Sequence, residues 1–243
     1  QKLQAKSAPY TLLSTEDQSI GIKAFVLGYM EEPESSTNES WRFMNVDADI
    51  VWYVYSGSGF CDTTLGRINF IEGNFIYIPA HITYQFSVKS TKVIMVGMES
   101  ATAYEYPRPR RIDNRDIPFS GANMRLPKPV DIFDSEDHVT FVSSDFNVYV
   151  KRAHDWSVVT YPYSPFDCVA WRGVVYPFVI DARKLDFSYT TSIHPDPSNF
   201  ATFVAKDFSA VISVLGEKYS HSLPYNHRNR WEECLFYAKE YEA

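Results

Sequence analysis

The first 105 residues contain short runs of apolar and β-branched residues that polar or glycine-containing stretches separate. The runs cover residues 20–27, 50–55, 70–71 and 75–78, and the stretch Ser-Gly-Ser-Gly at residues 56–59 ends the second of them. Residues 31–40 are polar with few apolar positions, which predicts a loop. Short strands joined by glycine-rich turns at this spacing predict a β-sandwich or a β-barrel.

The same pattern returns after a connector at residues 106–129 that is rich in proline, arginine, aspartate and asparagine. Alternating positions at 139–142 and 147–151 predict a half-buried hairpin, and residues 156–163 continue in the same style. Residues 174–180 are nearly all apolar, so we expect a central strand there. Two more strands are predicted at 200–205 and 210–215, and the one helix-like stretch, near 181–186, is short. The pattern predicts an all-β protein.

Composition narrows the class of protein. Hydrophobic residues make up 45% of the 243-residue chain, and the aromatic share of 16% favours strands. The net charge of −7 argues against a nucleic-acid binder, and the basic cluster at residues 108–111 lies among prolines, as in a solvated linker. No apolar run is long enough for a transmembrane helix. Three separated cysteines (Cys61, Cys168 and Cys234) are typical of reduced thiols, and we expect a cytoplasmic protein.

Candidate chemistry gathers near the end of the chain. His227 and Glu233 lie six residues apart, and an imidazole with a carboxylate supplies two ligands of the kind found in non-heme Fe(II) oxygenases. The alternative is a surface turn in which Glu233 pairs with a nearby arginine. His194, in the segment His-Pro-Asp-Pro, has a side chain that can accept a phenolic proton at neutral pH, or it caps a proline-stiffened turn.

Three segments of the chain resemble homogentisate 1,2-dioxygenases. They are Pro-Tyr-Asn-His-Arg-Asn with the following Glu-Cys-Leu-Phe-Tyr (224–237), Ile-His-Pro-Asp-Pro-Ser-Asn-Phe (193–200), and Ser-Pro-Phe-Asp-Cys-Val-Ala-Trp-Arg-Gly with Tyr-Pro (164–177). The resemblance implies that His227 and Glu233 are iron ligands and that His194 is the active-site base. It also implies Fe(II) as cofactor, homogentisate and O2 as substrates, and maleylacetoacetate as product, in tyrosine and phenylalanine breakdown.

The resemblance further implies a cupin fold, the double-stranded β-helix or jelly roll, present as two halves. We divide the chain into a first barrel at 1–105, a connector at 106–137 and a second cupin-like domain at 138–243 that is incomplete at Ala243. Gly73 and Pro79 have the spacing of the second cupin motif. The histidine pair expected before Asp49 is missing and Tyr84 takes roughly the place of the last ligand, so we expect the first barrel to be scaffold, with His81 a loop or core residue.

Several alternatives remain open at this point. The family's third iron ligand is a histidine on a later strand, whereas this chain ends ten residues after Glu233. We expect the polypeptide to continue, or another chain to supply the ligand, or the protein to be a metal-free bicupin with a binding or structural role. A related diphenolic acid such as gentisate is an alternative substrate. The resemblance also implies a homo-oligomer, a trimer or a hexamer, with no nucleic acid and no membrane among its partners.

Overall fold

The computed structural model describes residues 10–28, 42–89, 92–105, 111–112, 115–116, 121–129, 145–185 and 199–215. Regular structure in these residues is β-strand apart from two short 3-10 helices, η1 (Gly121–Asn123) and η2 (Ala182–Lys184). The all-β class is therefore confirmed, and the helix-like stretch near 181–186 holds a single 3-10 turn. The strands are β1 (Tyr10–Ser14), β2 (Ile20–Gly28), β3 (Arg42–Asn45), β4 (Asp49–Ser56), β5 (Ser58–Thr63), β6 (Gly66–Ile71), β7 (Asn74–Ile78), β8 (Thr83–Val88), β9 (Lys92–Ser100), β10 (Arg111–Ile112), β11 (Arg115–Asp116), β12 (Phe146–Arg152), β13 (Asp155–Tyr161), β14 (Phe178–Asp181), β15 (Asn199–Val204) and β16 (Val211–Leu215).

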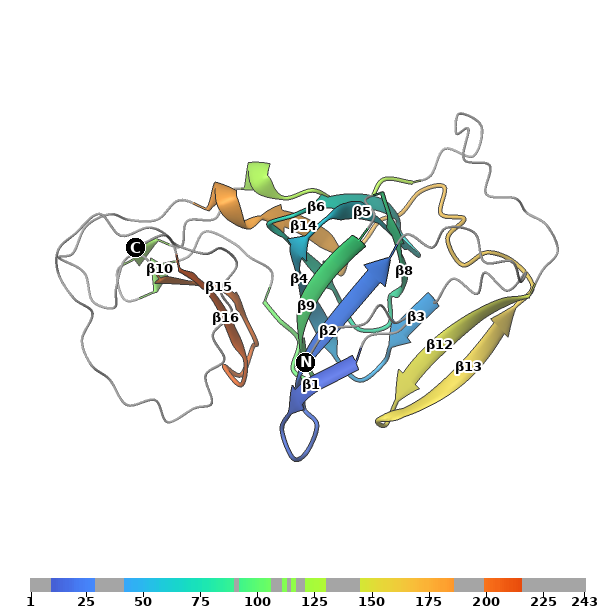
Figure 1. The fold of residues 1–243 in the computed structure, drawn as a ribbon, viewed down its shortest axis with the longest axis horizontal. Coiled ribbons are helices and arrows are strands. Elements are labelled where there is room, and N and C mark those ends of the chain that lie inside the picture. Colours follow the sequence, from blue (N-terminus) through green and yellow to red (C-terminus); the bar gives the residue numbers. More distant parts are fainter. Residues whose placement is uncertain are drawn as a thin grey trace.

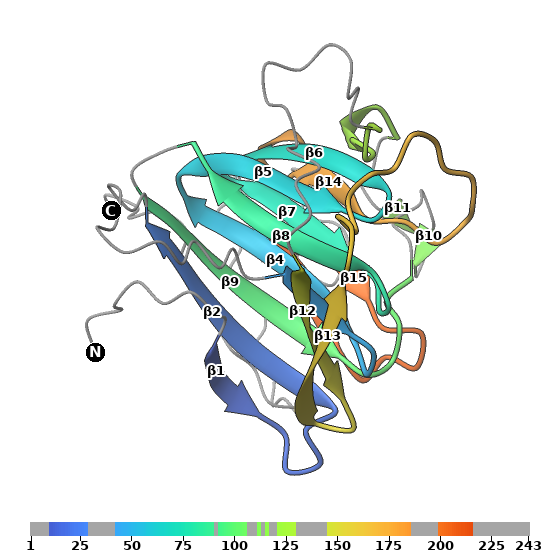
Figure 2. The same cartoon turned by 90° about the vertical axis from the view of Figure 1, so that its right-hand side faces the viewer.

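Strands β2 to β9 form a jelly roll. The first sheet has the order β1-β2-β9-β4-β7-β14 and the second sheet has the order β13-β12-β3-β8-β5-β6. Successive strands cross from one sheet to the other, except that β5 and β6 are neighbours in the second sheet. Figures 1 and 2 show the two sheets from perpendicular directions. This strand order is that of the double-sheet jelly roll, so the predicted double-stranded β-helix is confirmed.

Alternation of side chains explains how the strands lie in the sheets. In β5 half-buried and buried residues alternate strictly, and β9 follows the same rule over most of its length. Gly97 of β9 lies under the indole of Trp52, where an added Cβ would come within 2.6 Å of the ring. At the turn before β6, Gly66 has a φ of +112° and lies against the carbonyl of Lys128. Both positions therefore require glycine.

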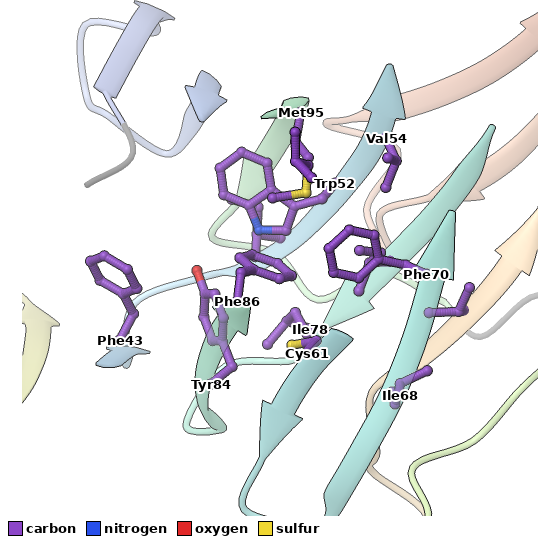
Figure 3. Close-up of a cluster of buried hydrophobic side chains, with 14 residues drawn as sticks. Phe43, Trp52, Val54, Cys61, Ile68, Phe70, Ile78, Tyr84, Phe86 and Met95 are labelled. Carbon is purple, nitrogen blue, oxygen red and sulfur yellow. The ribbon is translucent and has the colours of Figure 1, made fainter. Parts of the chain in front are cut away.

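The main hydrophobic core lies between the two sheets and is rich in aromatic rings (Figure 3). Trp52 and Phe70 both meet the ring of Phe86 edge to face, with centroids 6.2 and 5.7 Å apart. Such edge-to-face pairs add stabilisation to that of the buried area. The inward positions of the jelly roll are therefore filled by side chains.

A second core covers the outer face of the first sheet. The hairpin of β15 and β16 packs there and inserts Phe203, which is fully buried. Its ring lies 5.4 Å from that of Phe75 and 6.1 Å from that of Phe178. Figure 1 shows this hairpin (red-brown) on one side of the barrel, away from the second sheet. The first sheet is thus covered on both faces, which explains why its strands consist almost entirely of apolar residues.

The strands that follow the connector extend the sheets of the first barrel. β12 pairs in parallel with β3, β13 pairs with β12, and β14 pairs with β7. The strand predicted at 147–151 therefore forms a hairpin with the strand predicted at 156–163, whereas its predicted partner at 139–142 lies outside the described residues. The expectation of a central strand at 174–180 was wrong, because β14 is the terminal strand of its sheet and Val174 and Val175 are exposed. The domain boundary at 137/138 stays a prediction.

Across the described residues, no helix has the length and apolar character needed to cross a membrane.

Candidate functional site

The three predicted site residues, His194, His227 and Glu233, lie outside the described residues. The structure therefore gives no geometry for them, and the proposed roles stay predictions. It does describe the elements from which their segments extend. His194 comes nine residues after Leu185 and five before the start of β15, and His227 comes twelve residues after the end of β16. These three attachment points belong to, or pack on, the first sheet.

The chain leaves the barrel towards His194 through a tightly bonded corner. The side chain of Asn123 accepts a hydrogen bond from the backbone N–H of Asp181 (3.0 Å) and donates one to its carbonyl (2.9 Å). The carboxylate of Asp181 caps η2 by accepting from the backbone N–H of Arg183, and it pairs with the guanidinium at 2.9 Å. These bonds to Arg183 lower the pKa of Asp181, although partial burial opposes them. The Asp181 carboxylate is therefore ionised at neutral pH, and its bonds hold the corner in place.

The β15–β16 hairpin is fixed to the end of β9 by backbone bonds as well as by its core. The N–H of Glu105 donates to the carbonyl of Val204 at 2.8 Å, and the N–H of Lys206 donates to that of Ala103 at 3.1 Å. In the hairpin turn, the carboxylate of Asp207 accepts from the hydroxyl of Thr102. Hydroxyl and backbone bonds from Ser209, with that from Thr102, lower the pKa of Asp207 to about 2. Both sides of the His194 segment therefore begin from firmly held backbone.

A buried carboxylate joins this region to the interior of the fold. Asp49 at the start of β4 accepts hydrogen bonds from the hydroxyl of Tyr77 (2.7 Å) and from the backbone N–H groups of Ala80 (2.8 Å) and Tyr104 (3.0 Å). It is 4% exposed and all its contacts are donors, so it is a satisfied structural carboxylate. Through the bond to Tyr104 it holds in place the segment after β9, whose backbone bonds to the β15–β16 hairpin.

The first barrel has aromatic side chains where a metal-binding cupin would need imidazoles. Phe43 on β3 lies directly opposite Tyr84 on β8, and their rings are 5.9 Å apart. Both are buried in the main core, and burial is the main reason that the pKa of Tyr84 is raised well above its ordinary value. His81 lies in a turn, is exposed and has a φ of +67°. Of the two alternatives for His81, a loop or a core residue, the structure shows the loop, and the role of this barrel as scaffold stays a prediction.

Sequence reasoning missed a buried charge cluster at one end of the barrel. Glu99, 3% exposed, accepts hydrogen bonds from Asn45 and Lys151 and forms a 2.9 Å ion pair with Lys23. These groups come from β2, β3, β9 and β12. Burial raises the pKa of Glu99, but the two lysines outweigh it and the net shift is downward. Glu99 is an even number of residues from Val93 and Met95, so its side chain points to the same inward face of β9. This alternation was the one sequence feature that could have revealed it.

The cluster is structural rather than ligating. Each carboxylate oxygen of Glu99 already has a cationic partner, and a closed ion-pair network leaves no lone pair aimed at a vacant position. Within the described ranges, no three His, Cys, Asp or Glu side chains come together in a way that could hold a metal ion.

Residues 164–177 form part of the described chain and pack against the barrel. The hydroxyl of buried Ser164 accepts from the N–H of Phe166 (3.2 Å). The indole N–H of Trp171 donates to the carbonyl of Pro127 (3.3 Å), and its ring lies 5.5 Å from that of Tyr176. In the described structure, these contacts give the segment a packing role.

The chain matches the family model described as "Homogentisate 1,2-dioxygenase N-terminal" over residues 15–182. A Saccharolobus solfataricus protein named as a candidate dioxygenase is 26% identical over 222 residues, which are 88% of this chain and 54% of that protein. The homogentisate 1,2-dioxygenase of Rhodopseudomonas palustris is 29% identical over 67% of this chain and 35% of its own length. That of Emericella nidulans is 26% identical over 76% of this chain and 38% of its own. The chain thus spans about half or less of the length of these relatives.

Solved structures with some likeness include a cupin family protein with a double-stranded β-helix fold from Methanocaldococcus jannaschii. Its TM-score is 0.31 at 14% identity, over 41% of this chain and 84% of that one. A cupin protein from Bacteroides fragilis has a TM-score of 0.30 at 14% identity, over 41% and 82% of the two chains. The assignment of the jelly roll rests on the strand order described above.

Proposed function

We propose, from the premise that this chain belongs to the homogentisate 1,2-dioxygenase N-terminal family, that it is part of an Fe(II)-dependent dioxygenase that cleaves an aromatic ring. The observation that carries the proposal is the family match over residues 15–182, which includes every strand from β2 to β14. The segment 224–237 beyond that match contains the candidate ligands His227 and Glu233. Homogentisate is the proposed substrate and maleylacetoacetate the proposed product.

The donor set suits the metal. His227 and Glu233 would hold Fe(II) together with one further ligand, and an imidazole–carboxylate set of this kind is the usual one for non-heme iron. When bound, Fe(II) supplies open coordination positions at which an aromatic substrate and O2 meet. His194 would accept the proton of the substrate's ring hydroxyl, because a neutral imidazole is the side chain best matched to that transfer near pH 7.

The barrel contributes by holding the ends of the catalytic segments. The Asp181–Asn123 corner lies on the N-terminal side of the His194 segment, and the Phe203 core holds the hairpin between His194 and His227. A site that must keep two ligands and a base in register benefits from such rigid attachment. We also propose a cytoplasmic homo-oligomer, a trimer or a hexamer. Support for the compartment comes from Cys61 and Cys168, which are both free thiols.

The test uses the protein at its full natural length, purified without oxygen and reconstituted with Fe(II). Intact mass, iron per chain and O2 consumption with homogentisate and with gentisate are measured together. We expect about one iron per chain and faster turnover of homogentisate. Glu233→Ala should lose the iron and reduce turnover by at least about 100-fold. Glu232→Ala, its neighbour in sequence, is the matched control and should keep both.

His194→Ala should keep the iron but lower the turnover number by roughly 10²–10⁴-fold, the usual contribution of a general base. Iron-loaded protein that consumes no O2 with either diphenol would exclude ring cleavage. Faster turnover of gentisate would show that gentisate, and not homogentisate, is the substrate, and the proposal of ring cleavage would stand. A protein that binds no iron would instead be a metal-free cupin with a binding role.

A further inference from the structure

Exposed apolar side chains are frequent in the stretch that follows the connector. Of the large hydrophobic side chains exposed among the described residues, half lie within one stretch of twenty residues, 156–175. Three of them belong to a single strand: Trp156 (57%), Val158 (53%) and Val159 (40%). Exposed apolar residues scattered singly are ordinary, whereas several on one strand at a sheet edge favour an interaction there.

That strand is β13, the terminal strand of the second sheet among the described strands. In the part of the chain that the structure describes, its one strand neighbour is β12. Every residue of β13 from Asp155 to Thr160 is exposed. Figure 1 shows the β12–β13 hairpin (yellow) at the edge of the molecule, with β13 on its outer side.

The register of the hairpin shows which backbone groups of β13 point outward. Ala153 and His154 form a two-residue loop with φ values of +51° and +65°, as in a type I′ turn. Arg152 and Asp155, which flank the loop, are paired in register. Such a flanking pair exchanges both backbone hydrogen bonds, and the bonded and non-bonded pairs then alternate along the ladder. The N–H and C=O groups that point away from β12 therefore belong to Trp156, Val158 and Thr160.

The two edges of the second sheet differ in how they are protected. At the opposite edge, β6 is covered by the chain itself, because the backbone N–H of Arg67 donates to the carbonyl of Lys128 (2.8 Å) and the N–H of Lys128 donates back (3.0 Å). Between Trp156 and Thr160, β13 has no charged residue and no proline, the usual devices that block pairing at an edge. This edge is built to accept a strand.

We infer that β13 pairs with β13 of a second copy of the chain across a two-fold axis at Val158. An antiparallel pair centred there sets Trp156 opposite Thr160 of the partner subunit and Val158 opposite its own equivalent, so all three outward residues bond. Asp155 lies opposite the hydroxyl-bearing Tyr161 of the partner subunit, so no like charges meet. The strand is therefore complementary to itself, as an isologous interface requires.

The inference gives a surface to the hexamer proposed above and excludes the trimer, which has no two-fold axis, and it is independent of the catalytic proposal. A two-fold contact produces dimers or assemblies with an even number of protomers. Its experiment measures mass and cross-linking, whereas the catalytic proposal is tested by iron content and O2 consumption, so the failure of either is recognised separately.

The experiment measures the molar mass of the purified protein in solution by light scattering, for the parent chain and for Val158→Pro. Proline removes the outward N–H but no bond to β12, so the hairpin should form while the mass falls to half. Val158→Ala, which keeps the N–H, is the matched control and should retain the assembly. A monomeric parent, or one with an odd number of protomers, would overturn the inference.

A second variant covers the case in which the proline variant does not fold. Bonded antiparallel partners have Cα atoms about 5.5 Å apart, within the range of a disulfide. Val158→Cys should therefore give a disulfide-linked dimer under mild oxidation, whereas Val211→Cys, at an exposed valine of β16, should not. If Val158→Cys gives no cross-link and Val158→Pro leaves the mass unchanged, the β13–β13 contact does not form and the inference is wrong.

Discussion

The two hairpins that flank the barrel differ in the side chains that attach them. The β12–β13 hairpin, which continues the second sheet through β3, is also held by charge: Lys151 of β12 bonds buried Glu99, and the carboxylate of Asp47 accepts from the two backbone N–H groups of the loop, at 2.9 and 3.1 Å. The β15–β16 hairpin is held by an aromatic core around Phe203, with Asp207 bonding only at its turn. Figure 1 shows the two on opposite sides of the barrel.

The difference has a physical consequence. A buried ion pair is stabilising only while both partners stay charged, because its desolvation cost is already present in the fold. An aromatic core depends on filled volume and is indifferent to pH. Among the described strands the charge-held hairpin ends its sheet, whereas the core-held hairpin lies between the segments that carry the candidate catalytic residues. The attachment that must stay fixed is the apolar one.

The largest expected effect comes from removing the anchor of the core-held hairpin. Phe203→Ala should lower the free energy of unfolding by about 4 kcal/mol, because a fully buried phenylalanine leaves a cavity. Urea unfolding measures the change. Phe208→Ala, at a site 65% exposed in the same hairpin, is the control and should change it by less than about 0.5 kcal/mol. Equal effects of the two variants would contradict the assignment of Phe203 to the core.

A somewhat smaller effect is expected at the charge cluster. Glu99→Gln keeps the size of the side chain but leaves Lys23 and Lys151 without a counter-charge, which should cost about 3 kcal/mol in the free energy of unfolding. The double variant Glu99→Gln/Lys151→Met should recover part of the loss, because it removes one of the uncompensated charges. Urea unfolding of the single and double variants tests this. A double variant no more stable than the single one would show that the pair is not coupled.

The smallest effect is local and depends on pH. The folded pKa of Glu99 lies below its ordinary value of 4.5, so the unfolded state binds protons more readily, and the stabilisation present above pH 4.5 is lost as pH falls through the folded pKa. The pKa of Asp47 is lowered too: burial raises it, but the loop N–H groups outweigh this, so the same hairpin loses both carboxylate contacts in acid and keeps its pairing with β3. Asp207, with a pKa of about 2, stays ionised longer.

Hydrogen exchange between pH 5 and 3 should therefore show faster opening of β12 amides while those of β15 stay protected, after correction for intrinsic exchange rates. Glu99→Gln removes the main titrating group and should flatten the response of β12. Parallel loss of protection in both hairpins would show that acid unfolds the chain globally rather than at the charge-held attachment.

Local pattern predicted much of the fold. The apolar runs at 50–55 and 75–78, the glycine-rich turns and the aromatic content were enough to predict an all-β sandwich or barrel, because strand formation depends on the spacing of apolar residues over a few positions. The jelly roll came from the family resemblance, and β5 and β9 were not predicted. The same local reading placed residues 174–180 in the centre of a sheet. It was wrong there, because an apolar edge strand that is covered by a second core has the same composition as a central one.

The candidate site was identified from short sequence motifs rather than from geometry. His194, His227 and Glu233 were chosen by their spacing and by their resemblance to one family, and they lie outside the described residues, so their roles stay predictions. The Glu99 cluster was missed, although Glu99 has inward parity in β9. A lone glutamate on an apolar face shows no partner in sequence, because its lysines lie on strands distant along the chain.

The sequence by itself determined the class of fold, its aromatic character and the family to which the chain is related. These properties follow from residue type and local spacing. Tertiary structure alone decided that β12 pairs in parallel with β3 and that, among the described strands, β14 and β13 end the two sheets. The physical reason is that strand pairing joins backbone groups far apart in the chain, and every strand offers the same backbone groups, so only the complementary shape and charge of whole faces selects the partner.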